Sequence, residues 1–263
     1  RCFEYPNVTH VSNKIDPIAD IKTITLELIL ADIEAVMKRE DRIRNSAKGG
    51  NKEAAAEFAL LERLNKFLSD EKPARLFEGS DEEKPFMDNL FLLTAKPVIY
   101  AANISEMDMG KPEDEIPNVV KVKEYAKAEG SEVLVICAKT EEELSQMEPE
   151  ESAMFLEELG LKESGLNRLI KKSYELLGLI SYLTAGEKET RAWTIVKGTK
   201  APQAAGKIHS DFERGFIRAE IVAYDDLVRE GSMNACKEKG LVRSEGKDYV
   251  MKDGDVVLFR FNV

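Results

Sequence analysis

The chain has 263 residues, of which 43% are hydrophobic and 33% charged, so it can bury a sizeable core and form two or three compact units. Its longest apolar runs are far shorter than the roughly 20 residues of a membrane-spanning helix, which argues against a membrane partner. Three cysteines and two histidines are too few and too scattered for a disulfide framework or a structural zinc site.

The net charge of −11 is unevenly distributed along the chain. Residues 184–263 carry 14 Lys and Arg against 13 Asp and Glu, whereas residues 1–183 carry 24 against 36. The acidic body repels nucleic acid and we expect no DNA partner, but the near-neutral tail has local basic runs.

Two helical patterns come first in the chain. From Asp20 to about Arg44, and again from Ala54 to Leu68, apolar residues recur every three or four positions. The intervening Gly49-Gly50 pair predicts a break. We expect an antiparallel, coiled-coil-like helical hairpin within residues 20–89; two helices packed separately on a globular core are the alternative. Neither arrangement carries evident chemistry.

An α/β pattern follows. Residues 97–102 and 132–138 are apolar runs typical of buried strands, and a helix is expected at about residues 118–129. This order favours a parallel sheet, in which ligands bind at the carboxyl ends of strands. The sequence then reads as helix-rich to about Leu183. We assign residues 1–19 and 90–183 to this α/β domain.

The tail pattern changes to short strands. They are predicted at residues 193–196, 216–224, 249–251 and 256–261, with a turn at Asp253-Gly254-Asp255. A small mixed sheet with one or two helices is expected, which makes residues 184–263 a separate α+β domain.

Polar residues follow both strands of the predicted parallel sheet. The first strand ends in Asn103-Ile104-Ser105-Glu106, which resembles the base-specificity loop Asn-Lys-x-Asp of P-loop GTPases. In that loop the Asp accepts two hydrogen bonds from guanine. Glu106 carries one more methylene and Ile104 replaces the Lys, so guanine selectivity should be lost. The second strand ends in Cys137-Ala138-Lys139, which matches the Ser-Ala-Lys segment near the base.

These loops belong to a wider resemblance that covers essentially the whole chain. Together with the segments below they resemble the YchF, or Obg-like ATPase, family. The further segments are Arg1-Cys2-Phe3-Glu4, Thr9-His10-Val11, Ile15-Asp16-Pro17, Ala47-Lys48-Gly49-Gly50, Arg191-Ala192-Trp193-Thr194, Gly198 to Gly206, Ile208-His209-Ser210-Asp211-Phe212-Glu213 and Asp253-Gly254-Asp255.

The resemblance implies a P-loop nucleotidase domain with an inserted helical hairpin and a C-terminal TGS domain of β-grasp type. It also implies binding and hydrolysis of ATP, in preference to GTP, with Mg²⁺, as well as association with the ribosome or ribosomal RNA in the cytoplasm. The base-binding residues it carries over are Asn103, Ile104, Ser105, Glu106, Cys137, Ala138 and Lys139.

The phosphate-binding sequence Gly-x-x-x-x-Gly-Lys-Ser/Thr does not occur among the 263 residues. In the family it lies upstream of the segment matching Arg1, and it supplies the backbone N–H groups, the Lys and the Mg²⁺ ligand that hold the phosphates. We therefore expect this chain to lack that segment. We also expect it to contain no catalytic residue and no metal ligand, and not to hydrolyse ATP by itself.

A basic run in the tail is the second candidate site. Residues 197–218 carry five Lys and Arg against Asp211 and Glu213, with Phe212 and Phe216 nearby, a combination that suits RNA phosphates and bases. A solvated basic face is the alternative. The candidate RNA contacts are Lys197, Lys200, Lys207, His209, Arg214 and Arg218.

Two further interpretations stay open. His209 could instead pack locally, and His10 has a weaker claim to a nucleotide role. The chain as a whole could be a non-catalytic module that binds RNA or the ribosome, or it could belong to a GTPase.

Overall fold

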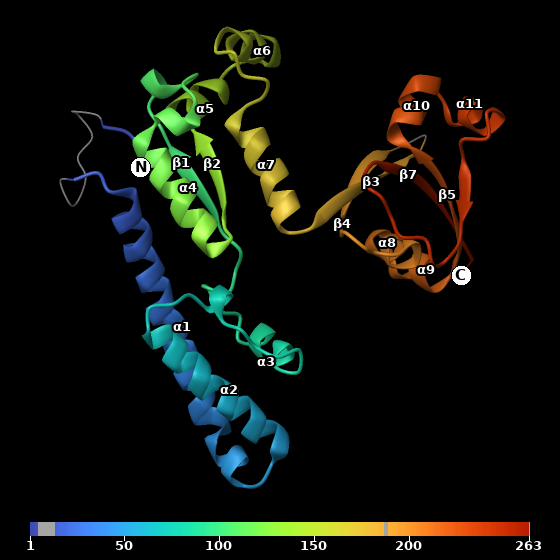
Figure 1. The fold of residues 1–263 in the computed structure, drawn as a ribbon. Helices are drawn as coiled ribbons and strands as arrows, with labels where there is room; N and C mark the ends of the chain where they lie inside the picture. Colours follow the sequence, from blue (N-terminus) through green and yellow to red (C-terminus); the bar gives the residue numbers. More distant parts are fainter. Residues whose placement is uncertain (5–13, 187–188, 263) are drawn as a thin grey trace. The chain divides into compact units, whose positions relative to one another are not determined.

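The computed structural model describes residues 1–4, 14–186 and 189–262 (Figure 1). The chain forms two compact units, residues 1–169 and 170–263, and each is described separately. His10 lies outside the described residues. No helix in the described parts is long and apolar enough to cross a membrane.

The first unit contains two parallel strands and several helices. Strands β1 (Ile99–Asn103) and β2 (Glu132–Ile136) pair in parallel, with Asn103 opposite Ile136, which confirms the predicted parallel pair. The α-helices of this unit are α1 (Pro17–Lys48), α2 (Lys52–Ser69), α3 (Lys84–Asp88), α4 (Pro117–Glu129), α5 (Ala138–Leu144), α6 (Pro149–Glu158) and the start of α7 (Gly165–Leu176). Short 3-10 turns are η1 (Ala74–Leu76), η2 (Glu106–Asp108) and η3 (Glu113–Glu115).

Helix α4 packs on the two strands and closes a small apolar core. Val119 and Val122 from α4 meet Ala102 of β1 and Val135 of β2 in this cluster. The left-handed Gly130 (φ +69°) ends α4 one residue after Glu129, as the sequence predicts. Ile18 and Ile21, in the first two turns of α1, also pack here, so the base of α1 is attached to the strands.

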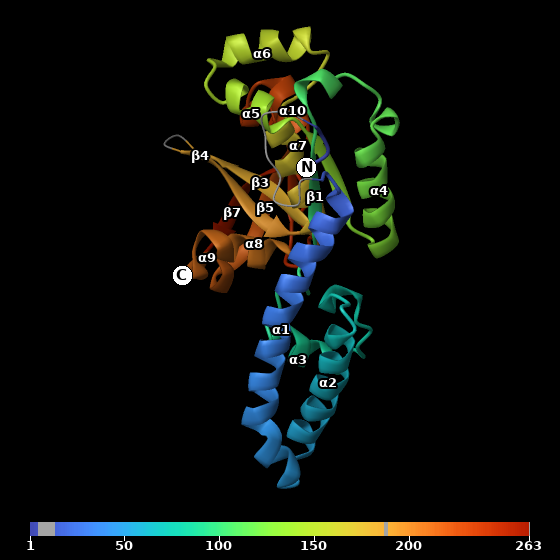
Figure 2. The same ribbon diagram turned by 90° about the vertical axis from the view of Figure 1, so that its left-hand side faces the viewer.

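Helices α1 and α2 lie side by side in both views (Figures 1 and 2). Leu61, Leu64 and Leu68 of α2 are fully buried against apolar residues of α1 such as Ile29 and Val36. Gly50 takes the left-handed backbone (φ +87°) between the helices, a conformation that glycine adopts without steric cost. Asn51 then caps α2, because its side chain accepts a hydrogen bond from the Ala54 amide.

The segment that returns from α2 to β1 is fastened to α1 by a buried carboxylate. Asp32 of α1 is 2% exposed and accepts hydrogen bonds from the Leu93 amide at 2.7 Å and the Thr94 amide at 2.8 Å. The Thr94 hydroxyl donates to the same carboxylate at 2.6 Å. That hydroxyl also accepts from the Ala74 amide, so one cluster holds both ends of the return segment on α1.

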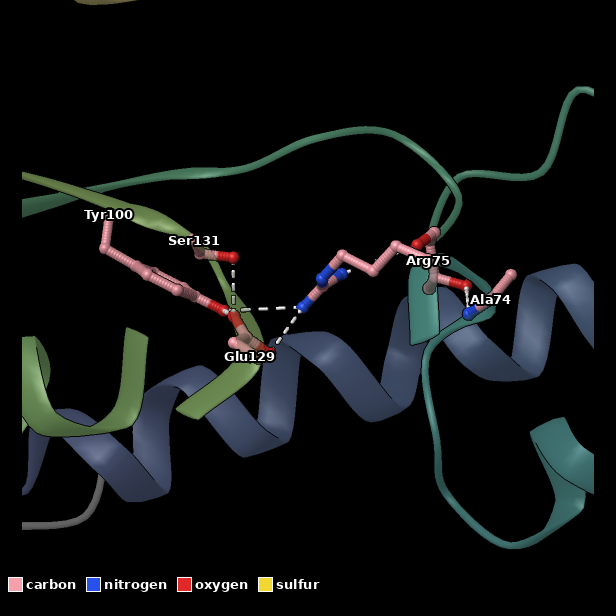
Figure 3. A network of polar contacts seen from close by, with 6 residues as sticks. Ala74, Arg75, Tyr100, Glu129 and Ser131 are labelled. Carbon is pink, nitrogen blue, oxygen red and sulfur yellow. Dashed lines mark hydrogen bonds and ion pairs between the residues drawn. The ribbon is translucent and has the colours of Figure 1, made fainter. Parts of the chain in front are cut away.

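A second polar cluster joins this segment to the strands (Figure 3). The Arg75 guanidinium contacts the Glu129 carboxylate at 2.9 Å, and both side chains are close to 10% exposed. The hydroxyl groups of Tyr100 and Ser131 donate to the same carboxylate. Burial raises the pKa of the Tyr100 hydroxyl, followed by its hydrogen bond to Glu129, so this phenol remains a donor at neutral pH.

The second unit is built on a five-stranded sheet in the order β4-β3-β7-β5-β6. Strand β3 pairs in parallel with β7, and the other neighbours are antiparallel. The strands are β3 (Leu179–Ala185), β4 (Thr190–Val196), β5 (Phe216–Ala223), β6 (Arg243–Glu245) and β7 (Asp255–Phe261). The helices are the end of α7, α8 (Ala201–Ile208), α9 (Ser210–Arg214), α10 (Tyr224–Glu230) and α11 (Met233–Glu238).

The two faces of this sheet have different apolar clusters. The larger contains buried residues of α8, such as Ala204, together with Tyr182, Ile221 and Phe259 from three strands. Tyr182 is fully buried, and its hydroxyl donates to the Ala204 carbonyl at 2.8 Å, so it fixes α8 on β3. A smaller cluster links the sheet to α10 and α11.

Three predictions for this unit need correction. The helix-rich reading to about Leu183 is wrong from Leu179 onward, because those residues form β3 and pair with β4. The expected domain boundary before residue 184 therefore falls inside a strand. The strand predicted at residues 249–251 is an isolated bridge between Lys200 and Val250, and the sheet is completed by β6, which the sequence pattern did not reveal.

Candidate functional site

The predicted base-binding residues lie at the carboxyl ends of β1 and β2. Because these strands are parallel and Asn103 pairs with Ile136, the loops that follow them begin side by side. The Ile104 amide donates to the Ile136 carbonyl at 2.8 Å, which continues the pairing by one step. The Cys2 amide donates to the Asn103 carbonyl, so the N-terminal segment lies along the other edge of β1.

Asn103 connects the two loops through its side chain. Its Oδ1 atom accepts a hydrogen bond from the Ala138 amide at 2.9 Å. This contact joins the Asn-Ile-Ser-Glu segment to the Cys-Ala-Lys segment, 35 residues later in the chain. Asn103 therefore holds the geometry of the site, and its amide nitrogen stays available for a ligand acceptor.

Glu106 and Lys139 form an ion pair across the site. The Lys139 ammonium lies 2.7 Å from Glu106 Oε2 and 3.8 Å from Glu143 Oε1. The side chains of Glu106 and Lys139 are 42% and 62% exposed, so this pair is solvated and its net contribution to stability is about 1 kcal/mol or less. The pair nevertheless orients the Glu106 carboxylate toward Lys139.

Ser105 shapes the first loop. Its hydroxyl donates to Asp108 Oδ2 at 2.7 Å, which stabilises the short turn that contains Glu106. Asp108 also pairs with Lys111, and the hydrogen bond from Lys111, followed by that from Ser105, lowers the pKa of the Asp108 carboxyl. Asp108 is thus ionised and already neutralised at physiological pH.

A pocket of about 300 Å³ opens between these loops. Six of the seven predicted base-binding residues line it, and Ala138 contributes the amide that fixes Asn103. The sequence analysis did not predict that Phe3 lines this pocket, although Phe3 lies in the Arg1-Cys2-Phe3-Glu4 segment that contributes to the family resemblance. The lining residues are Phe3, Asn103, Ile104, Ser105, Glu106, Cys137 and Lys139.

The pocket has the chemistry of a binding site for a flat heterocycle. Phe3 and Ile104 offer apolar surface, while Asn103, Glu106 and Lys139 supply one amide and two opposite charges. Arg1 lies over the Phe3 ring, with its guanidinium carbon 4.9 Å from the ring centroid. Among the residues that the structure describes, no group of three or more His, Cys, Asp or Glu side chains is placed to hold a metal ion.

The cations among the candidate RNA contacts of the second unit differ in whether a carboxylate pairs with them. Three of the five cations are paired with carboxylates: Lys200 with Asp248, Arg214 with Asp211 and Arg218 with Glu220. Lys197 and Lys207 are exposed, and neither has an ion pair with the residues described. His209 Nδ1 accepts a hydrogen bond from the Asp211 amide, so this histidine caps α9.

The two aromatic residues of that run do not present faces to RNA bases as expected. Phe216 is 5% exposed and belongs to the core of the sheet. Phe212 is half-buried, and its ring stacks on Phe261 with 3.8 Å between the centroids. The sequence window placed these rings beside cations, but the alternation of β5 and the packing of α9 turn them inward.

Glu220 of β5 gathers three cations that are far apart in sequence. Arg260 lies at 3.1 Å, Arg218 at 3.2 Å and Lys237 at 3.9 Å. The hydrogen bond from Arg260 lowers the pKa of the Glu220 carboxyl below its usual 4.5. A lowered folded-state pKa contributes stability that is present above the unfolded-state pKa and is lost as pH falls through the folded-state pKa.

We therefore expect Glu220→Gln to reduce the acid-induced loss of stability in the second unit. Wild type should be more stable than the variant by up to about 1 kcal/mol above about pH 4.5, because both arginines are half exposed, and this difference should disappear as the pH falls below that value. Urea titrations at graded pH, followed by the fluorescence of the single tryptophan, Trp193 in β4, measure it. The exposed Glu213→Gln is the control. Equal pH profiles for the two variants would contradict the assignment.

Comparison with known proteins places these features in a family context. A family model named YchF-GTPase_C, described as a protein of unknown function (DUF933), matches residues 179–262. Over all 263 residues the chain is 56% identical to the ribosome-binding ATPase YchF of Bacillus subtilis, of which it covers 72%. It is 46% identical to the ribosome-binding ATPase YchF of Escherichia coli O157:H7, of which it covers 71%.

Eukaryotic relatives show the same likeness. The chain is 40% identical to the rat Obg-like ATPase 1 and covers 67% of it. The solved structure of the Schizosaccharomyces pombe YchF GTPase matches 98% of this chain and 70% of that one, with 36% identity and a TM-score of 0.83. The likeness thus extends across both units of the chain.

Proposed function

The chain belongs to the YchF family, and on that premise we propose that it forms the base-binding and ribosome-associating part of an ATP-hydrolysing protein. The observation that carries the proposal is the pocket at the joined ends of β1 and β2, where Asn103, Glu106 and Lys139 converge. Relatives that align with the whole chain are named ribosome-binding ATPases. A ribosome partner would place the protein in the cytoplasm.

We assign adenine as the preferred base. Guanine needs a carboxylate that accepts from its ring N–H and its exocyclic amine together, and Lys139 already occupies Glu106 at 2.7 Å. Ile104 offers only apolar contact to the base. An adenine ring presents no such donor pair, so its binding does not require the Glu106 carboxylate to leave Lys139.

The wider assignments follow from the same family membership. We propose that α1 and α2 are the helical hairpin inserted in the nucleotidase domain, and that the second unit is a TGS domain of β-grasp type. The central parallel pair of β3 and β7, with α8 packed across the sheet, supports the latter.

The residues near the pocket do not fit a magnesium site. Among the described residues no group of three or more His, Cys, Asp or Glu side chains converges there, and Glu106 and Asp108 each pair with a lysine. The Gly-x-x-x-x-Gly-Lys-Ser/Thr sequence is not among the 263 residues. We therefore propose that these residues alone bind the base of ATP without hydrolysing it, and we assign them no catalytic role.

We expect Glu106→Asp to raise the ratio of GTP affinity to ATP affinity about tenfold, a difference of ~1.4 kcal/mol. The shorter side chain withdraws the carboxylate from Lys139 and brings it to the length found in guanine-binding loops. Nuclear magnetic resonance titrations with ATP and with GTP measure the ratio. Glu142→Asp makes the same change on the exposed side of α5 and serves as the control.

Two results would overturn this proposal in favour of the alternatives. A wild-type chain that prefers GTP, with little change in Glu106→Asp, would indicate a GTPase site. A chain that binds neither nucleotide but binds RNA in a salt-sensitive manner would indicate a non-catalytic RNA- or ribosome-binding module. Hydrolysis of ATP by the 263-residue chain would contradict the assignment of the phosphate site to other residues.

A further inference from the structure

A basic groove lies on the α1–α2 pair, well separated from the base pocket. It encloses about 450 Å³ and is lined by Ala35, Lys38, Arg39, Arg42, Glu57, Asn89 and Leu90. Its cations lie about 25 Å along α1 from Ile21, the residue that packs near the strands, at 1.5 Å per helical residue. Three cations and one carboxylate give the lining a net charge of +2.

The cations of this groove differ in how they are paired. Arg39 holds the buried Glu57 with two hydrogen bonds, at 2.6 and 2.9 Å, and these raise the pKa of the guanidinium. Lys38 pairs with Glu34 at 2.6 Å, but both side chains are about two-thirds exposed, so a stronger anion can displace that contact. Arg42 makes no hydrogen bond or ion pair with the residues described.

The positive charge extends from the groove to the turn between the helices. Residues 38–52 contain six Lys or Arg and two acidic residues, a net charge of +4 in a chain whose total is −11. Arg44 pairs with Asp41 on the exposed side of α1. Like charges gathered on one surface repel each other, and an anionic partner relieves that repulsion.

We propose that this groove binds the phosphate backbone of RNA through Lys38 and Arg42, with Arg39 positioned by Glu57 at the floor. The proposal rests on the ribosome association proposed above and names the surface that makes the contact. RNA is favoured over a protein partner because only Ala35 and Leu90 offer apolar lining, and protein interfaces depend on buried apolar or aromatic anchors. Arginine forks suit phosphate oxygens, and Asn89 adds a polar side chain.

The second unit offers a weaker surface for the same purpose. Lys200, Arg214 and Arg218 are each paired with a neighbouring carboxylate, which leaves Lys197 and Lys207 as the cations of that run without an ion pair among the described residues. In the groove, Lys38 has one exposed contact, with Glu34, and Arg42 has no ion pair among the described residues. The larger share of salt-sensitive RNA binding is therefore assigned to the groove.

The test compares two double variants that remove the same charge. Lys38→Gln with Arg42→Gln empties the groove of its accessible cations and leaves the Arg39–Glu57 contact intact. Lys22→Gln with Lys66→Gln removes two exposed cations elsewhere on the same helices. Fluorescence anisotropy with fluorescein-labelled polyuridine, at several NaCl concentrations, gives the affinity and its salt dependence. Thermal melting by circular dichroism verifies that both variants fold.

The groove variant should bind polyuridine about tenfold more weakly, with a salt slope shallower by about 1.4, since each single-strand phosphate contact contributes about 0.7. The control pair should stay within about twofold of wild type. Equal losses in both variants would show a response to net charge alone and would overturn the proposal. Wild-type affinity in the groove variant would overturn it as well.

Sedimentation with ribosomes separates this proposal from the one on which it rests. If the wild-type chain does not sediment with ribosomes, the ribosome association is wrong. If it does and the groove variant sediments equally, the association stands and the groove assignment is wrong. If only the groove variant no longer sediments with ribosomes, the result supports both the ribosome association and the groove assignment. Sedimentation without any polyuridine binding would point to a ribosomal protein as the occupant and would overturn RNA as the ligand.

Discussion

Replacing Arg75 with methionine is expected to lower the free energy of unfolding of the first unit by about 3–5 kcal/mol. The arginine side chain is 12% exposed and its partner Glu129 is 8% exposed. Methionine conserves much of the volume but removes the opposing charge. Glu129 would then be left with only the hydroxyl groups of Tyr100 and Ser131, which do not neutralise a buried carboxylate.

Urea unfolding followed by circular dichroism at 222 nm measures this effect. The fluorescence of Trp193 reports the second unit in the same samples, and its midpoint should not move. Arg44→Met is the matched control. Arg44 pairs with Asp41, but both side chains are exposed, so this pair should contribute less than about 1 kcal/mol to stability.

A double variant provides a sharper test of the charge argument. Adding Glu129→Leu to Arg75→Met removes the stranded carboxylate and should restore part of the lost stability. A loss below about 1 kcal/mol in Arg75→Met, or a double variant less stable than the single, would contradict this account of the cluster in Figure 3.

The second large effect is expected for Asp32→Ala, at about 3 kcal/mol. This change removes the acceptor of three hydrogen bonds and leaves the Thr94 amide, which is buried, without its partner. Hydrogen bonds to a charged acceptor contribute about 1.5–3 kcal/mol each, and partial relaxation of the return segment limits the sum.

Hydrogen exchange at the Thr94 amide measures the local consequence, and urea unfolding measures the global one. Glu27→Ala removes an exposed carboxylate from the same helix and should change stability by less than about 0.5 kcal/mol. Unchanged protection of Thr94 in Asp32→Ala would show that the amide finds another acceptor and that α1 does not depend on this contact.

The elements with continuous local patterns could be predicted from sequence. The apolar runs at residues 97–102 and 132–138 correspond to β1 and β2, and the two helical patterns correspond to α1 and α2. Strand β3 could not be predicted, because Leu179–Ala185 is apolar enough for a helix or a strand. Its state is decided by pairing with β4 and β7, which lie later in the chain.

The candidate base site could be located from its two motifs, but its contacts could not. Nothing local in the sequence indicates that Asn103 accepts from the Ala138 amide or that Phe3 lines the same pocket. The pairing of Lys139 with Glu106 likewise joins residues 33 positions apart. The base-binding role itself stays a prediction until the nucleotide titrations are made.

The net charge of a sequence window was a poor predictor of which cations are available for RNA. The run from Lys197 to Arg218 counts as basic along the chain, yet most of its cations are paired in space. The groove on α1 lies in a stretch that is basic along the chain, residues 38–52, but its shape could not be predicted, because Glu57 and Asn89 approach Lys38 and Arg42 only after the chain has turned back.

Helix α1 has a mechanical consequence that follows from its continuity. It runs unbroken for 32 residues, about 48 Å, with its single proline in the first turn and no glycine before Gly49. Such a helix moves as a stiff rod about its attached end at Ile18 and Ile21, and the return segment fastened to it at Asp32 would have to move with it. A tilt of about 5° about the attached end would carry the far end through about 4 Å. Small rearrangements beside the strands would therefore become large displacements at the distal turn.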